Sequence, residues 1–564
     1  MVSSVFNIAV TGLTTAQAGL SAISNNISNA GTKGYSRQDI VQVEASGVQT
    51  RLGYLGNGAE LEDIRRASSD FLNTRLNEAL SVESYFKTYN EQISQIDGVL
   101  SDDVNGVASG LTGFFTAIQD LTTRPGDLAT RESVITAATT VAGRINSVNT
   151  AMDRIRDDIN GKLQGAMDAV NGITRQLADL NVQITEASNR GGKGATPNDL
   201  LDRRDGLLRE LSEFVSNTVV NNGDNTINVY MKSGQPLVSK TKSSELSALR
   251  DNFDPLTIQI GMKVGKDENG ADRTVRFDAT ALGRGKIAGL LAMRDTDLVQ
   301  YRNIVGVVGG QFAERINNLQ KEGFDLNGTA GVNMFTFNTS LASRSSANAS
   351  SASVNITNVD FAKVKSNDYE LFNDGGTLKY RVANSRSPYA EATLVSSGDP
   401  ATYKIGEEFT FTLSGASQSG DRFLLQPVND VARTLRLNLS GASEVAAGRT
   451  AGARGDASNL QRMALLQTST VRNSAFGAEQ DVTITSAFNQ LVSRVGNRGR
   501  EIAEAATTST AVREGAEAQQ QDLSGVNLDE EAANLLKYQQ AYQAAGQVIA
   551  MSKNLFDSLL NAIG

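Results

Sequence analysis

The sequence predicts a mainly α-helical protein with an inserted β domain, in which the helices at the two ends of the chain pair as a coiled coil. Three observations favour this fold. Apolar residues recur every seven positions at both ends of the chain, another such repeat runs from Asp127 to Asn189, and residues 330–450 are rich in Ser, Thr, Asn and Gly. A chain of 564 residues is long enough for several domains with their own cores.

The first predicted helix lies in the opening segment, which carries no charge before Lys33. Two neighbouring lines of residues have a seven-residue spacing there: Phe6, Leu13, Leu20 and Ile27, and beside them Ala9, Ala16, Ile23 and Ala30. This spacing places each line along one face of a helix. The segment is too polar for a transmembrane helix and lacks the basic and apolar regions of a cleavable secretory signal. We therefore expect a helix that packs against other helices.

The last predicted helix repeats this pattern at the other end of the chain. Its apolar line is unbroken and has a neighbouring line of Tyr538, Ala545 and Leu559: Leu528, Leu535, Tyr542, Ile549, Phe556 and Ile563. Asn527 can cap the start of this helix, and acidic residues follow where the helix dipole favours them. Residues 538–552 carry no charge, whereas solvated coiled coils usually carry Glu and Lys beside the seam. We expect the ten residues of the two main lines to form an assembly seam.

The interior predicts further helices and two β regions. The expected helices span residues 69–100, 107–122, 127–189, 198–215, 284–322 and 456–520, and alternating residues with turn signals near 217–280 predict a small β part. The predicted division has three parts: residues 1–45 and 525–564 as a terminal coiled-coil domain, residues 46–329 and 451–524 as a helical rod domain, and residues 330–450 as a β-rich domain that projects from it.

Composition excludes several classes of function. The net charge is −9, which disfavours nucleic acid or an anionic membrane as partner. Cys and His are absent, so catalytic triads, thiolate nucleophiles and the common zinc sites cannot form. We predict no catalytic, cofactor-binding or metal-binding residues. GRGKIA at 283–288 and the tripeptide Arg454-Gly455-Asp456 are interpreted as chance matches to nucleotide-binding and adhesion motifs.

Both ends of the chain resemble the bacterial flagellar axial proteins. SNNISNAGTKGYSRQ at 24–38 is similar to the N-terminal signature of these rod, hook and hook-associated subunits, and SGVNLDEEAANLLKYQQAYQAAGQVI at 524–549 is similar to their C-terminal signature. GLLAMRDTDL at 289–298, EGFDLNG at 322–328 and SGDRFLLQP at 419–427 resemble the FlgK family of the hook–filament junction. Lys33 stands where that family usually has Pro.

The resemblance implies a non-enzymatic structural subunit. It implies self-assembly into a helical axial structure, contact with hook subunits and with a second junction protein, and an extracellular location in the flagellum. It also implies export through the flagellar type III apparatus without a cleavable signal peptide, with a chaperone on the C-terminal helix between Leu528 and Ile563. Two alternatives remain: a hook or distal-rod subunit, and a secreted adhesin or enzyme that uses residues 330–450 as its active module.

Overall fold

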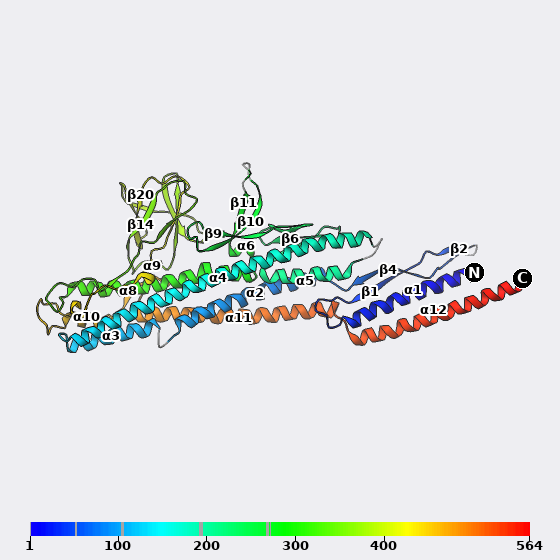
Figure 1. Ribbon diagram of the computed structural model, residues 1–564, viewed down its shortest axis with the longest axis horizontal. Coiled ribbons are helices and arrows are strands. Elements are labelled where there is room, and N and C mark those ends of the chain that lie inside the picture. The colour runs from blue at the N-terminus through cyan, green and yellow to red at the C-terminus, as the bar shows by residue number, and fades with distance from the viewer. Residues whose placement is uncertain are drawn as a thin grey trace.

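The chain forms an elongated molecule with both termini at the same end (Figure 1). The computed structural model describes residues 2–50, 53–102, 106–190, 196–266, 270 and 272–563. Long helices run along the molecule, the terminal helices extend from one end of it, and two groups of β-strands stand on one side (Figure 1). The expected fold class, a helical rod with paired terminal helices and a projecting β-rich domain, is confirmed.

The rod is built from long and short helices that lie side by side. They are α2 (Asp70–Leu100), α3 (Val107–Thr123), α4 (Leu128–Arg190), α5 (Asn198–Phe214), α7 (Lys286–Ala292), α8 (Val299–Glu322), α10 (Ser458–Leu465) and α11 (Ile484–Ser524). The Asp127 carboxylate caps α4, because its Oδ2 accepts a hydrogen bond of 3.1 Å from the Thr130 amide. The predicted helix over 127–189 is confirmed, because α4 spans Leu128–Arg190.

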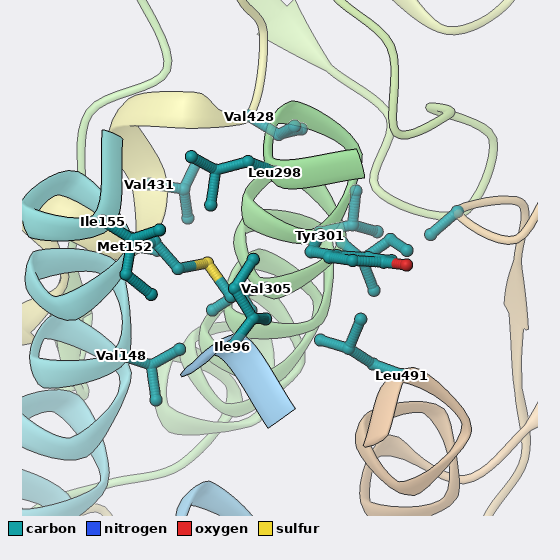
Figure 2. Packing of buried hydrophobic residues seen from close by; sticks show 14 of the residues in the cluster. Ile96, Val148, Met152, Ile155, Leu298, Tyr301, Val305, Val428, Val431 and Leu491 are labelled. Carbon is teal, nitrogen blue, oxygen red and sulfur yellow. The ribbon is translucent and has the colours of Figure 1, made fainter. Parts of the chain in front are cut away.

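The rod core fills the space between α2, α4, α8 and α11. Ile96, Met152, Val305 and Leu491 come from these four helices and point toward one another (Figure 2). All four are buried, and the buried positions of α4 follow the seven-residue repeat of the sequence. The apolar area removed from water along this core is the main stabilising contribution to the rod.

Two small antiparallel sheets cover one side of α4. The first contains β5 (Asn217–Asn221), β6 (Ile227–Met231), β7 (Pro236–Ser239) and β8 (Lys242–Ser243), and the second contains β9 (Leu246–Arg250), β10 (Ile258–Lys266) and β11 (Asp272–Phe277), followed by the short helix α6 (Ala279–Leu282). Asparagines of α4 hold them: the amides of Asn160, Asn171 and Asn181 donate to the carbonyls of Leu256, Leu246 and Ile227 at 3.0, 2.8 and 2.9 Å.

The projecting β domain consists of two packed sheets. One has the order β13 (Ala342–Arg344), β21 (Arg422–Leu425), β15 (Tyr369–Asp374), β16 (Thr377–Val382) and β17 (Ala390–Glu391), and the other β14 (Ser353–Val359), β20 (Phe409–Ser414), β19 (Ala401–Ile405) and β18 (Thr393–Ser396). The rings of Tyr369 and Phe409, one from each sheet, lie 5.5 Å apart. The strands between Ala342 and Leu425 thus share one core.

The terminal part consists of two helices and a β-ribbon. Helices α1 (Val2–Ser28) and α12 (Leu528–Ile563) lie side by side, and β1 (Gln38–Glu44) pairs with β4 (Ala59–Arg66) beside α1, with β2 (Val48–Thr50) and β3 (Gly53–Leu55) at the far end of the ribbon (Figure 1). Gly58 of the ribbon lies against α1, since a Cβ on it would stand 3.2 Å from the Ile8 Cα.

Several segments differ from the sequence-based expectation. Residues 46–66, assigned to the helical rod domain, are mostly ribbon, and the predicted helix over 456–520 is interrupted by the hairpin of β23 (Val471–Asn473) and β24 (Gln480–Val482). The helix over 284–322 contains a π-helical segment, Met293–Leu298, between α7 and α8. Part of 330–450 belongs to the rod, because Val428 and Val431 point into its core (Figure 2). This part contains α9 (Asn429–Thr434) and the strand pair β12 (Phe335–Thr336) and β22 (Arg436–Leu437). A 3₁₀ turn, Ala442–Glu444, follows.

Candidate assembly site

The terminal helices α1 and α12 present the candidate site. Most buried residues of α1 are small, and they include three of the four members of the second line of the sequence repeat: Ala9, Thr15, Ala16, Ala22 and Ile23. The fourth member, Ala30, lies after the helix and is exposed. Small side chains allow close approach of neighbouring elements, here α12 on one side and the β-ribbon on the other (Figure 1). The line of large residues, Phe6, Leu13, Leu20 and Ile27, is therefore not the most deeply buried line of α1.

The ten predicted seam residues divide into two groups in the structure. Leu13, Leu20, Leu535 and Ile549 are half-buried in the helix pair. Phe6, Ile27, Leu528, Tyr542 and Phe556 are exposed, with Phe6 at 43% and Phe556 at 54% of their surface open to solvent. The side chain of Ile563 lies outside the described residues. The first group contributes to packing within the chain, whereas the second group has no such use in a single copy.

Large apolar side chains are exposed along the two helices. On α1 these include Val5, Phe6, Ile8 and Val10, and on α12 they include Leu536, Val548, Met551, Leu555 and Phe556. Exposed apolar side chains that gather on one part of a protein mark interaction surfaces. Because residues 538–552 also lack charge, this surface is suited to burial against other protein.

Asn26 connects α1 to α12 and to β1 at the inner end of the helix pair. Its side chain is 1% exposed. Its Nδ2 donates to Glu531 Oε2 at 3.1 Å and to the Gln38 carbonyl at 3.0 Å, while its Oδ1 accepts from the Tyr35 hydroxyl at 2.7 Å and from the Gln38 amide at 2.9 Å. Every hydrogen-bonding position of this amide is in use.

A second set of polar contacts connects the segment after α1 to helix α5. The Ser36 amide and hydroxyl donate to Asp202 at 3.0 and 2.7 Å. Arg66, at the end of β4, donates to Asp202 at 2.9 Å and to Asp205 at 2.7 Å. Burial opposes the charge of Arg66, but the two aspartates outweigh this effect and raise its pKa.

We call Asn26, Tyr35, Ser36, Arg66, Asp202, Asp205 and Glu531 the junction cluster. Burial, together with the charges of Asp202 and Glu531, raises the pKa of Tyr35 to about 12, so its hydroxyl keeps its proton and donates to Asn26 at neutral pH. The signature at 24–38 contains Asn26, Tyr35 and Ser36. Their place in the signature could have marked them as candidate contact residues, because polar side chains that become buried need hydrogen-bond partners. Glu531 lies in the second signature, at 524–549, whereas Arg66, Asp202 and Asp205 had no signal in the sequence.

One of the two chance motifs of the sequence has a structural role. The Asp456 carboxylate accepts hydrogen bonds of 2.9 and 3.0 Å from the amides of Arg449 and Thr450, so the adhesion-like tripeptide uses its carboxylate within its own loop. In the described part of the chain, no helix combines the length and apolar character needed to cross a membrane, and no group of three or more His, Cys, Asp or Glu residues could hold a metal ion.

Comparison with known proteins matches this architecture to one family. The chain is 32% identical to flagellar hook-associated protein 1 of Salmonella typhimurium over 570 aligned residues, which cover 99% of this chain and 100% of that protein. The chain belongs to the family of flagellar hook-associated protein 1, FlgK. Its relative in Escherichia coli K12 is 31% identical with the same coverage, and that in Bacillus subtilis is 22% identical over 98% of this chain and 96% of that one.

The family comparison also maps onto the parts of the structure. The model of the flagellar hook-associated protein FlgK helical domain matches residues 93–335, from within α2 to β12. The terminal helices match models of flagellar basal body rod proteins, at residues 6–35 and 520–562. The flagellar hook junction protein FlgK from Burkholderia pseudomallei shares the fold, with a TM-score of 0.71 at 21% identity, covering 80% of this chain and 100% of that one.

Proposed function

We propose that this chain is a structural adaptor that joins the hook of the bacterial flagellum to its filament and that assembles through its terminal helices. The chain is a structural protein of the flagellum, because it belongs to the FlgK family. The single observation that carries the proposal is the exposed apolar surface of α1 and α12 at one end of an elongated molecule. Burial of such surface drives association.

The proposed partners are copies of the same chain, hook subunits and a second junction protein. In this assembly the ten predicted seam residues are covered by neighbouring subunits. Support comes from the exposed members of that set, such as Phe6, Tyr542 and Phe556, and from relatives whose names describe them as hook-associated or hook junction proteins. Both terminal helices match models of flagellar basal body rod proteins, which supports an axial position for these helices.

We further propose an extracellular location, reached by flagellar type III export. An export chaperone would cover α12 between Leu528 and Ile563 before assembly. Exposed side chains of this helix, among them Leu536 and Met551, give such a chaperone an apolar surface to bind. We also propose the division of the chain into a terminal domain, a rod domain and a β-rich domain over 330–450. The strands of the two packed sheets of the β-rich domain lie between Ala342 and Leu425.

A strain that lacks this chain tests the proposal. We expect complete hooks without filaments, and flagellin shed into the medium, because the filament has no base on which to assemble. Electron microscopy of the cells and immunoblotting of the medium are the measurements. Hooks that are missing altogether would instead support a hook or distal-rod subunit. This is the second candidate function, because the two ends of the chain match models of rod proteins. Filaments still attached to hooks would contradict both.

A further inference from the structure

We propose that the junction cluster positions the terminal helix pair, fixing the direction in which α1 and α12 leave the rod. This inference rests on the proposed function, because an axial subunit must present its assembly surface at a defined angle to the rest of the molecule. It assigns a role to residues of the signature at 24–38 that is distinct from the apolar seam.

The connection between the two parts of the molecule is thin. The chain crosses it twice, between β4 and α2 and through the three residues between α11 and α12. The last buried apolar cluster on the adjoining side of the rod is small, with Leu76 and Ala79 of α2 against Ala516 of α11. Apolar packing therefore contributes little to the angle between the parts.

The junction cluster supplies directional contacts across that connection. Asn26 joins α1, α12 and β1 through Glu531 and Gln38. Ser36 and Arg66 join the ribbon to α5 through Asp202. The Arg37 amide also donates to the Ser524 carbonyl at 2.8 Å, which ties the ribbon to the end of α11. Charge-assisted hydrogen bonds have strict geometry, so these contacts fix orientation more than they add stability.

The contact between Asn26 and Glu531 allows a swap of donor and acceptor. Glu531 is 2% exposed, and its Oε2 accepts from the Asn26 amide. Asn26→Asp places a second carboxylate beside it and removes the hydrogen between them. Glu531→Gln alone keeps an acceptor for Asn26. In the double variant the new glutamine on α12 can donate its amide hydrogen to the new aspartate on α1, which restores the hydrogen bond between the helices but not the one to the Gln38 carbonyl.

The in vivo test complements a deletion strain with the full chain carrying Asn26→Asp, Glu531→Gln or both. We expect Asn26→Asp to lower the number of filamented cells by about tenfold or more, because like charges side by side in a desolvated site are strongly disfavoured. We expect Glu531→Gln to keep filaments and the double variant to regain them in part. Filamentation with Asn26→Asp at the wild-type level, or a double variant as impaired as Asn26→Asp, would overturn the proposal.

Spin-label distances in the purified full-length chain separate positioning from folding, because the chain contains no native cysteine. One pair of introduced cysteines, at the exposed positions Arg203 of α5 and Gln539 of α12, spans the junction. A control pair at Arg203 and the exposed Ala518 of α11 lies within the rod. We expect Asn26→Asp to broaden the first distribution only, and the double variant to narrow it again.

Three results from the labels would overturn the proposal. The first is a distance distribution across the junction that is already broad in the wild type. The second is a distribution in Asn26→Asp that is as narrow as in the wild type. The third is equal broadening in the control pair, which would mean a folding defect of the rod. Failure of the proposed function is a different result: it requires filaments on the hooks of the deletion strain, whatever the label distances are.

Discussion

The ring of Tyr538 on α12 lies directly against the backbone of Gly19 on α1. A Cβ at position 19 would stand 2.7 Å from the Cδ1 and Cε1 atoms of that ring, which is closer than non-bonded carbon atoms approach. The absence of a side chain at Gly19 therefore determines how closely the two helices pack. This contact explains a glycine in the middle of a helix, where it is otherwise unfavourable by about 0.8–1 kcal/mol relative to Ala.

We predict that Gly19→Leu separates α1 from α12 and prevents incorporation into the flagellum. The reason is steric, because the Tyr538 ring cannot leave without losing its own packing. Motility of a complemented deletion strain is the measurement. Gly12→Ala is the matched control: a Cβ at Gly12 has no atom within 4 Å, and the helix gains about 0.8–1 kcal/mol. Equal motility of the Gly19→Leu strain and wild type would show that the helix pair does not pack this way when assembled.

We predict that Leu20→Asp or Ile549→Asp abolishes incorporation while the rod stays folded. Both side chains are half-buried in the helix pair, where burial of a large apolar side chain contributes about 1.5–3 kcal/mol and a carboxylate is strongly unfavourable. The rod core is built from other helices and does not use either residue. Thermal melting of the purified chain checks the second part, with Thr508→Asp at an exposed position of α11 as control. A large fall in the melting temperature would place both residues in the core of the single chain.

The turn after α1 leads to a prediction about Lys33. The Tyr35 amide donates to the Thr32 carbonyl at 3.2 Å, and Gly34 has φ = +87°, which together define a type II turn with Lys33 at its second position. Proline is favoured there, so we expect Lys33→Pro to keep motility and to raise stability by up to about 1 kcal/mol. Gly34→Ala is the contrast, because its φ is unfavourable for Ala and its Cβ would lie 3.2 Å from Arg209 Nη2. Loss of motility with Lys33→Pro would mean that the lysine side chain makes a necessary contact.

The sequence predicted the rod better than the terminal part, and the reason lies in the size of the buried residues. In α4 the repeat of Ile145, Met152 and Ile159 is both the most apolar and the most buried line, so pattern and structure agree. In α1 the buried line holds Ala9 and Ala16, whose small apolar area gives a weak signal beside Phe6 and Leu13.

The ribbon and the junction cluster had still weaker signals. The ribbon strands β1 and β4 expose residues on both faces, so they lack the alternation by which a half-buried strand is recognised. The junction cluster joins residues up to 505 positions apart in the chain, and its polar side chains look like any solvated surface until the fold brings them together. Likewise, no local pattern distinguishes the π-helical segment, Met293–Leu298, from the helices around it.

A buried carboxyl between the rod and the β domain gives a prediction about pH. Asp368, 7% exposed, accepts hydrogen bonds of 2.7 Å from the Asn303 amide of α8 and the Gln426 amide. Burial raises its pKa, and the charge of Arg302 and these two hydrogen bonds offset this only in part. The folded chain therefore holds this proton at pH values where the unfolded chain has released it. Its contribution to stability is complete below the unfolded pKa of about 3.9 and is lost as the pH rises through the folded value.

Asp368→Asn removes this dependence and keeps the shape of the side chain, so its free energy of unfolding relative to wild type should increase with pH. Denaturant unfolding from about pH 4, near the unfolded pKa, to about pH 8 measures the difference, with Asp168→Asn at an exposed position as control. A difference that is constant or decreases with pH would show that Asp368 is charged in the folded chain and that its partners fully stabilise that charge.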